Sequence, residues 1–127
     1  MERKNRRQFT YNVRPGLTVL VGSLTFGALG VVPADPEATF PGVASVVKFA
    51  ATGLYRVNFS DTYLNIVGFD GSAKLAAAGA DGYDICLLND YATDGYSTFQ
   101  VLQGGTARDI PGITIYLTYW LKTSEQG

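Results

Sequence analysis

Hydrophobic and polar residues alternate with a period of two along several short stretches of this chain. The clearest is ITIYLTYWLK, residues 113–122, in which alternate side chains are predicted to point to opposite faces of a strand. One face carries Ile113, Ile115, Leu117, Tyr119 and Leu121, and the other carries Thr114, Tyr116, Thr118, Trp120 and Lys122. Because aromatic residues occur on both faces, we expect both faces to be at least partly covered.

The same reading predicts a series of further strands. Alternation in LYRVNFS, residues 54–60, places Tyr55, Val57 and Phe59 together on one face. Residues 73–80 are ambiguous, since alanine favours a helix but the span is short and contains Gly79. The other predicted strands are 17–26, 43–50, 63–69, 83–89 and 97–103, with a shorter one at Phe9, Tyr11 and Val13.

Turn and loop signals separate these strands. Residues 31–42 contain three prolines and predict a loop, because proline removes a donor from the strand ladder. A second polar loop is predicted at 89–95 and a turn at 106–112. Further turn signals are Arg14-Pro15-Gly16, Ala51-Thr52-Gly53, Asp70-Gly71, Asp81-Gly82 and Gly104-Gly105.

These elements predict an all-β protein. Seven or eight short strands, spaced about ten residues apart and without intervening helices, are typical of a closed antiparallel fold. We expect a jelly-roll-like antiparallel sandwich or barrel with an extended N-terminal arm. The predicted division is a basic arm at residues 1–16 and a single β-domain at residues 17–127. The length of the whole chain, 127 residues, and its 46% hydrophobic content are sufficient for one hydrophobic core.

Charge is distributed unevenly. Residues 1–14 contain five Lys or Arg and one Glu, whereas residues 15–127 contain five Lys or Arg and ten Asp or Glu, so net charges of +4 and −5 give the total of −1. Only the arm is therefore positioned to attract an acidic partner. A secretory signal is disfavoured, because the apolar run after the arm is interrupted by Thr18, Gly22 and Ser23; we expect a soluble protein.

Catalytic chemistry has little support. The chain contains no histidine, which removes the commonest general base and a common metal ligand. Its single cysteine, Cys86, lies in an apolar strand and is predicted to be a core residue. Gly104-Gly105 lacks the lysine and helix of a phosphate loop. We expect no enzyme activity and no cofactor.

Two other residue sets have open interpretations. Asp81, Asp84, Asp90 and Asp94 flank predicted turns, so turn stabilisation is favoured over a metal site or an acid–base pair. The aromatic residues Tyr91, Tyr96, Tyr116 and Trp120 are candidates for an oligomer or partner surface. A carbohydrate-binding module with Tyr91, Tyr96 and Trp120 as stacking platforms is an alternative.

The arm itself has three interpretations: a solvated terminus, a nucleic-acid contact, or a segment that docks on a partner subunit. Interleaving of its cations with an apolar alternation favours docking, and nucleic acid is the less favoured partner. The predicted partner-binding residues are Arg3, Lys4, Arg6, Arg7, Phe9, Tyr11 and Arg14.

Residues 52–64, TGLYRVNFSDTYL, resemble a stretch found in small β-rich structural proteins of tailed bacteriophages. The C-terminal part is also similar, with a Gly-Gly turn, Ala-Arg-Asp and the strand ITIYLTYWLK. The resemblance spans residues 43–122 and is to capsid cement or decoration proteins. It implies a structural virion protein made in the host cytoplasm, without a membrane partner, that grips the major capsid protein on the outer capsid surface. It also implies a homo-oligomer, a trimer or a dimer.

Overall fold

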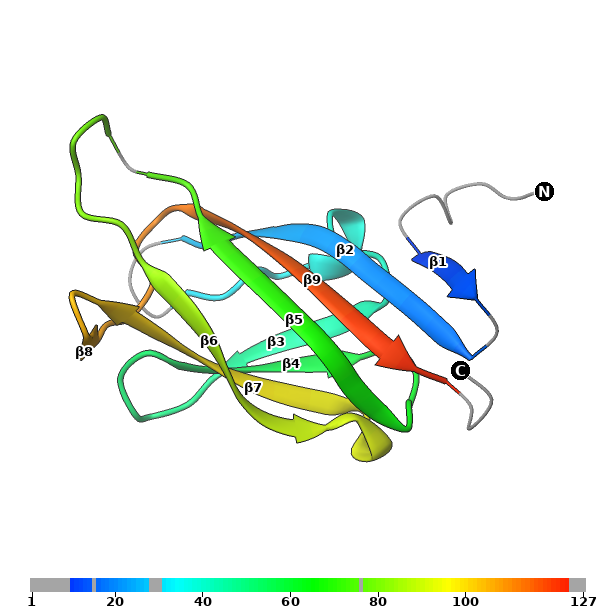
Figure 1. Ribbon diagram of the computed structural model, residues 1–127. Helices are drawn as coiled ribbons and strands as arrows, with labels where there is room; N and C mark the ends of the chain where they lie inside the picture. The colour runs from blue at the N-terminus through cyan, green and yellow to red at the C-terminus, as the bar shows by residue number, and fades with distance from the viewer. Residues whose placement is uncertain (1–9, 15, 28–30, 76, 124–127) are drawn as a thin grey trace.

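The computed structural model describes residues 10–14, 16–27, 31–75 and 77–123, with side chains described from Gly16 onward. It confirms the predicted all-β class. Two antiparallel sheets pack face to face as a jelly-roll-like sandwich (Figure 1). Among the described residues, no helix is long and apolar enough to cross a membrane.

The first sheet, sheet A, is built around the C-terminal strand. Strand β9 pairs along its whole length with β2 on one side and with β5 on the other. The spatial order is β1 (Thr10–Arg14), β2 (Leu17–Thr25), β9 (Thr114–Lys122) and β5 (Asn65–Ala73).

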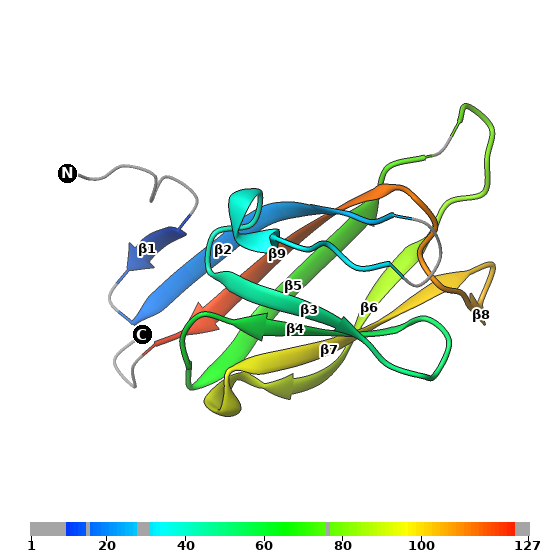
Figure 2. The same cartoon turned by 180° about the vertical axis from the view of Figure 1, so that it is seen from behind.

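The second sheet, sheet B, lies behind sheet A in Figure 1 and in front of it in Figure 2. Short 3₁₀ turns at Pro36–Ala38 (η2) and Ala92–Asp94 (η3) stand beside its strands. The spatial order is β3 (Val43–Lys48), β4 (Leu54–Phe59), β7 (Tyr96–Gln103) and β6 (Asp84–Tyr91), and the short β8 (Thr106–Ala107) also pairs with β7.

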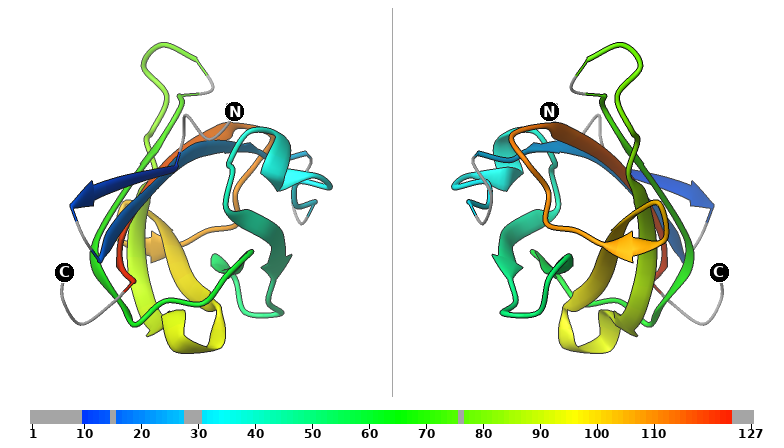
Figure 3. Two further views of the ribbon diagram at one scale, coloured as in Figure 1. Left: turned by 90° about the vertical axis from the view of Figure 1, so that its right-hand side faces the viewer. Right: turned by 90° about the vertical axis from the view of Figure 1, so that its left-hand side faces the viewer.

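The chain changes sheets four times, between β2 and β3, β4 and β5, β5 and β6, and β8 and β9. Strands β5 and β6 lie side by side and close one edge of the sandwich, as the end-on views in Figure 3 show. Beyond the part of β2 that pairs with β1, Ser23 N–H donates to the carbonyl of Thr39, so the predicted 31–42 loop is tied to sheet A.

The core lies between the sheets, on the face that the alternation predicted. All five inward residues of the 113–122 stretch are buried, and so are Tyr55, Val57 and Phe59 of β4. Tyr119 of β9 contacts the rings of Phe40, Phe59 and Phe69 at centroid distances of 6.3, 5.1 and 5.0 Å. One hydrophobic cluster includes residues from both sheets, which supports a single β-domain.

One hydrogen bond joins the sheets through this core. The hydroxyl oxygens of Tyr119 in β9 and Ser97 in β7 lie 2.8 Å apart, and both residues are buried. Burial raises the pKa of the Tyr119 phenol far above its usual range, so Tyr119 stays neutral. The polar pair is therefore satisfied inside an otherwise apolar core.

The predicted turn at Asp70-Gly71 is wrong, because β5 continues through both residues to Ala73. Gly71 faces the core, where an added Cβ would lie 3.0 Å from the Ile85 side chain and 3.1 Å from Leu117 Cδ2. The glycine is needed here because β6 and β9 approach closely, not because the chain turns.

The predicted arm is partly a strand of this domain. Thr10–Arg14 form β1, which pairs with residues 17–20 of β2 in the same chain. The short strand expected at Phe9, Tyr11 and Val13 is thus present from Thr10 onward, where it pairs with β2 of its own sheet. Arg3, Lys4, Arg6, Arg7 and Phe9 lie outside the described residues, and for Tyr11 and Arg14 only the backbone position is described.

Candidate functional site

The predicted aromatic residues divide between the outer faces of the two sheets. Tyr116 and Trp120 alternate with the buried residues of β9 and lie on the outer face of sheet A. Tyr91 and Tyr96 lie at the paired ends of β6 and β7 in sheet B. The structure therefore does not bring Trp120 together with Tyr91 and Tyr96, and the three-residue sugar platform is not formed.

On the outer face of sheet B, two rows of directly paired residues run across the strands. Strand pairing gives the order Val47, Arg56, Thr98 and Asn89 in one row, and Ser45, Asn58, Tyr96 and Tyr91 in the next. We call this surface the arginine–tyrosine face.

Arg56 stacks on Tyr96 in this face. The guanidinium carbon lies 3.7 Å from the centroid of the Tyr96 ring, a close cation–π contact. The Tyr96 ring in turn lies 4.9 Å from the Tyr91 ring at an interplanar angle of 36°. Arg56, Tyr96 and Tyr91 thus form a continuous stack across three strands.

The arginine is fixed in place but lacks an anionic partner. Among the described residues, no carboxylate lies within ion-pair distance of Arg56, and its buried Nε has no hydrogen-bond acceptor. The neighbouring polar pair is satisfied, since Asn58 Nδ2 donates to Ser45 Oγ at 2.9 Å. Because Nε is buried, a group from outside can reach only the two terminal Nη groups, which have no partner among the described residues.

Apolar side chains accompany this cation. Val47 lies directly across from Arg56, and Leu88 lies at the β-bulge of β6, next to Asn89 of the same row. Three side chains of this region are well exposed to solvent: Val47 (41%), Leu88 (51%) and Tyr91 (42%). Arginine and tyrosine are enriched at protein interfaces and among the residues that contribute most to binding, so Arg56, Tyr91 and Tyr96 give this face the composition typical of a protein-binding surface.

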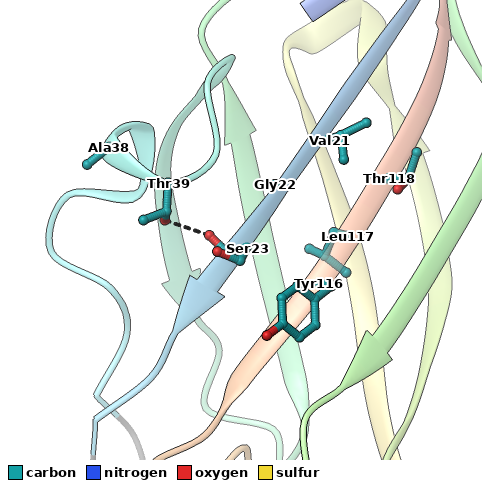
Figure 4. Close-up of a pocket in the computed structure, with 8 residues that line it drawn as sticks. All are labelled: Val21, Gly22, Ser23, Ala38, Thr39, Tyr116, Leu117 and Thr118. Carbon is teal, nitrogen blue, oxygen red and sulfur yellow. Dashed lines mark hydrogen bonds between the residues drawn. The ribbon is translucent and has the colours of Figure 1, made fainter. Parts of the chain in front are cut away.

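A groove of about 390 Å³ lies on the outer face of sheet A, against the 31–42 loop (Figure 4). Tyr116, 47% exposed, stands along one side, and Thr39 stands on the other, where its hydroxyl donates to the Ser23 carbonyl at 2.6 Å. The lining contains no ionisable group other than the Tyr116 phenol and comprises Val21, Gly22, Ser23, Ala38, Thr39, Tyr116, Leu117 and Thr118. This groove suits an apolar side chain rather than a reaction.

The predicted core position of Cys86 is wrong. Cys86 is exposed on the outer face of β6, while its neighbour Ile85 is buried. The strand is apolar on both faces, and hydrophobicity alone does not reveal which half of such a strand faces the core.

The four predicted aspartates do not form a metal-binding cluster in the described part of the chain. No group of three or more His, Cys, Asp or Glu suited to a metal occurs within the described part of the chain. Asp90 accepts hydrogen bonds from the backbone N–H groups of Ile66 (2.8 Å) and Ala92 (3.0 Å), so it ties β5 to η3. For Asp90, the preferred interpretation, stabilisation of a turn, is confirmed.

One ionised pair fastens the end of the sandwich remote from Tyr91. Asp109 Oδ1 accepts the Gly53 backbone N–H at 2.7 Å and lies 3.2 Å from Lys48 Nζ. The Gly53 N–H and the Lys48 ammonium lower the Asp109 pKa against the opposing effect of burial. The cluster joins two loops and has no open position for a substrate.

Because the folded-state pKa of Asp109 is depressed, its stabilising effect is present above the unfolded-state pKa of about 4 and is lost as the pH falls below it. We expect Asp109→Asn to lower the free energy of unfolding at pH 7, with the deficit shrinking toward pH 3. Urea unfolding at both pH values measures this. Asp84→Asn is the control, since the exposed Asp84 side chain makes no hydrogen bond or ion pair with the described residues; an equal deficit at both pH values would contradict the assignment.

Arg56, Val47 and Leu88 were not singled out from the sequence. The alternation of 54–60 placed Arg56 opposite the core residues, but its contact with Tyr96 depends on the register between β4 and β7. No protein-family model matches this chain, and neither a curated protein nor a solved structure matches it.

Proposed function

We propose that this protein is a non-catalytic structural protein that cements a bacteriophage capsid by binding across major capsid protein subunits. The observation that carries the proposal is that two different surfaces suited to binding lie on the outer faces of the two sheets. The arginine–tyrosine face carries a stacked cation with apolar neighbours, and the sheet A groove carries Tyr116 over an apolar floor.

Two surfaces on opposite layers suit a bridging role. A protein that only decorates a shell needs one contact, whereas a protein that holds two subunits together needs two. The sandwich is a rigid spacer between them, since its sheets are joined by the Tyr119 cluster and the Ser97 hydrogen bond. The basic residues of 1–9 add a third, electrostatic contact to an acidic shell.

The test first identifies a major capsid protein gene next to the gene of this chain and then uses shells assembled from that capsid protein. Wild-type protein is expected to co-sediment with the shells and to raise their disassembly temperature. Tyr116→Ser, which alters the groove, and Arg56→Gln, which alters the other face, are each expected to leave the domain folded. Each is expected to retain weaker binding, reduced about tenfold, and to lose the shell stabilisation.

Leu75→Ser is the matched control, because Leu75 is also exposed but lies in the loop after β5. It is expected to bind and stabilise shells like the wild type. Absence of wild-type co-sedimentation would contradict the proposed function. Full shell stabilisation by both face variants would contradict the bridging arrangement.

The arm is tested separately with a deletion of residues 1–9, which leaves β1 intact. Removal of residues 1–16 would also remove the strand that pairs with β2 and would confuse binding with folding. The shorter deletion is expected to weaken shell binding at low salt and to have little effect at high salt, where charges are screened.

A further inference from the structure

We infer that Arg56, held by Tyr96 and Tyr91, is the binding site for a carboxylate side chain of a protein partner. This assignment deepens the proposed function, because it names the chemistry recognised by one of the two faces. It is nevertheless argued from the face alone and has a test that needs no capsid.

The first step is the state of the guanidinium. Arginine offers five N–H donors in a planar fork that matches a carboxylate bidentately. Arg56 is partly buried, stacked at 3.7 Å on Tyr96, and unpaired among the described residues. Its conformational freedom is already restricted in the free protein, so less entropy is lost when an anion binds.

The second step is the contrast with Lys48, which also lies on a strand of sheet B. Lys48 is neutralised by Asp109 at 3.2 Å and donates to the Phe49 carbonyl at 2.9 Å. The fold thus pairs one cation of this sheet internally and leaves Arg56 without an anion. A carboxylate is the complementary charge that the arginine–tyrosine face lacks.

The third step concerns the source of the carboxylate. Val47 and Leu88 are exposed aliphatic groups beside the stack, and a protein partner buries such groups together with an anion. A sugar acid would use free aromatic faces instead, but one face of Tyr96 is covered by Arg56. The two rows of this face contain no carboxylate, so a second copy packed face to face would bring another arginine rather than an anion. These features favour a single carboxylate on a largely apolar segment of a different protein.

The experiment titrates the full chain with a short peptide that carries one glutamate between two leucines, and with the same peptide carrying glutamine. The Arg56 Nε–H resonance and the amide resonances of β4 and β7 report binding. We expect the glutamate peptide to shift these signals with a dissociation constant in the millimolar range. The glutamine peptide is expected to bind at least tenfold more weakly.

Variants separate the contributions. Arg56→Lys keeps the positive charge but loses the planar guanidinium that can bind a carboxylate through two N–H groups. It is expected to weaken binding of the glutamate peptide about tenfold. Arg108→Gln is the control, because Arg108 is exposed in the loop after β8 and is expected to bind as the wild type does.

Three outcomes would overturn the inference. They are equal binding of the two peptides, binding of glucuronate at Arg56 without binding of the peptide, and a self-association that Arg56→Gln abolishes. If the peptide binds as expected but the wild-type protein does not sediment with shells, the carboxylate site stands and the capsid proposal fails. If the protein binds the shells but neither peptide binds the protein, the capsid proposal stands and the carboxylate site fails.

Discussion

Gly53→Ala is expected to abolish stable folding, whereas Gly79→Ala is expected to be tolerated. Both glycines have a positive φ, +74° at Gly53 and +80° at Gly79, so both variants incur the left-handed backbone penalty of about 1–2 kcal/mol. Only Gly53 also lacks space. A Cβ there would lie 2.7 Å from the Val101 carbonyl oxygen and 2.9 Å from that of Arg108, and nothing lies within 4 Å at Gly79.

The Val101 carbonyl that the new methyl group would meet already accepts the Arg108 N–H at 3.0 Å. Gly53 cannot easily move away either, because its carbonyl accepts the Val101 N–H at 2.8 Å and its N–H is donated to Asp109. We expect Gly53→Ala to lose about 4 kcal/mol or more of the free energy of unfolding, a large part of the ~5–15 kcal/mol of a typical domain. Guanidinium unfolding of both variants measures the difference. Losses of equal size would show that the surrounding carbonyls yield to the new methyl group.

Phe40→Ala is expected to cost about 3–5 kcal/mol of the free energy of unfolding. Phe40 comes from the proline-containing loop, is fully buried and stacks against Tyr119. On its other side it packs directly on Gly22, where an added Cβ would lie 2.5 Å from the Phe40 ring and from its Cα. Removal of the ring leaves a cavity that Gly22, which has no side chain, cannot fill.

Graded substitutions test this explanation. Phe40→Leu retains most of the volume and is expected to cost about 1.5 kcal/mol or less, and Leu75→Ala, at an exposed position, about 0.5 kcal/mol or less. Because Ala38 and Thr39 line the sheet A groove just before Phe40, we also expect Phe40→Ala to weaken shell binding more than its loss of folded protein explains. A Phe40→Ala cost no larger than that of Phe40→Leu would contradict the cavity argument.

The two proposed binding surfaces differ in how they are built. The groove on sheet A is formed partly by the 31–42 loop, which is held against β2 by backbone and Thr39 hydrogen bonds. Phe40 of this loop packs beneath the groove, so the shape of the groove also depends on Phe40. The arginine–tyrosine face depends only on strands β3, β4, β7 and β6 and on their register. Substitutions in the loop should therefore alter one surface without altering the other.

Sequence periodicity determined the strands and most of the core of this protein. Alternation in 54–60 and 113–122 identified the buried faces of β4 and β9, because side chains on a strand point to opposite sides with a period of two. Prolines located the 31–42 loop for a similarly local reason. The missing histidine also made catalysis unpromising before any contact was known.

Tertiary structure decided whatever depends on two strands at once. Gly71 signalled a turn locally, but it lies within β5 because two neighbouring strands need the space. Cys86 and Ile85 are both apolar, and only packing showed that Ile85 faces inward and Cys86 outward. The sequence suggested one shared surface for four aromatic residues, but Tyr116 and Trp120 lie in sheet A and Tyr91 and Tyr96 lie in sheet B. The stack of Arg56 on Tyr96 arises from long-range strand register, which no local pattern encodes, so the surface that best supports a function was the part that the sequence alone did not determine.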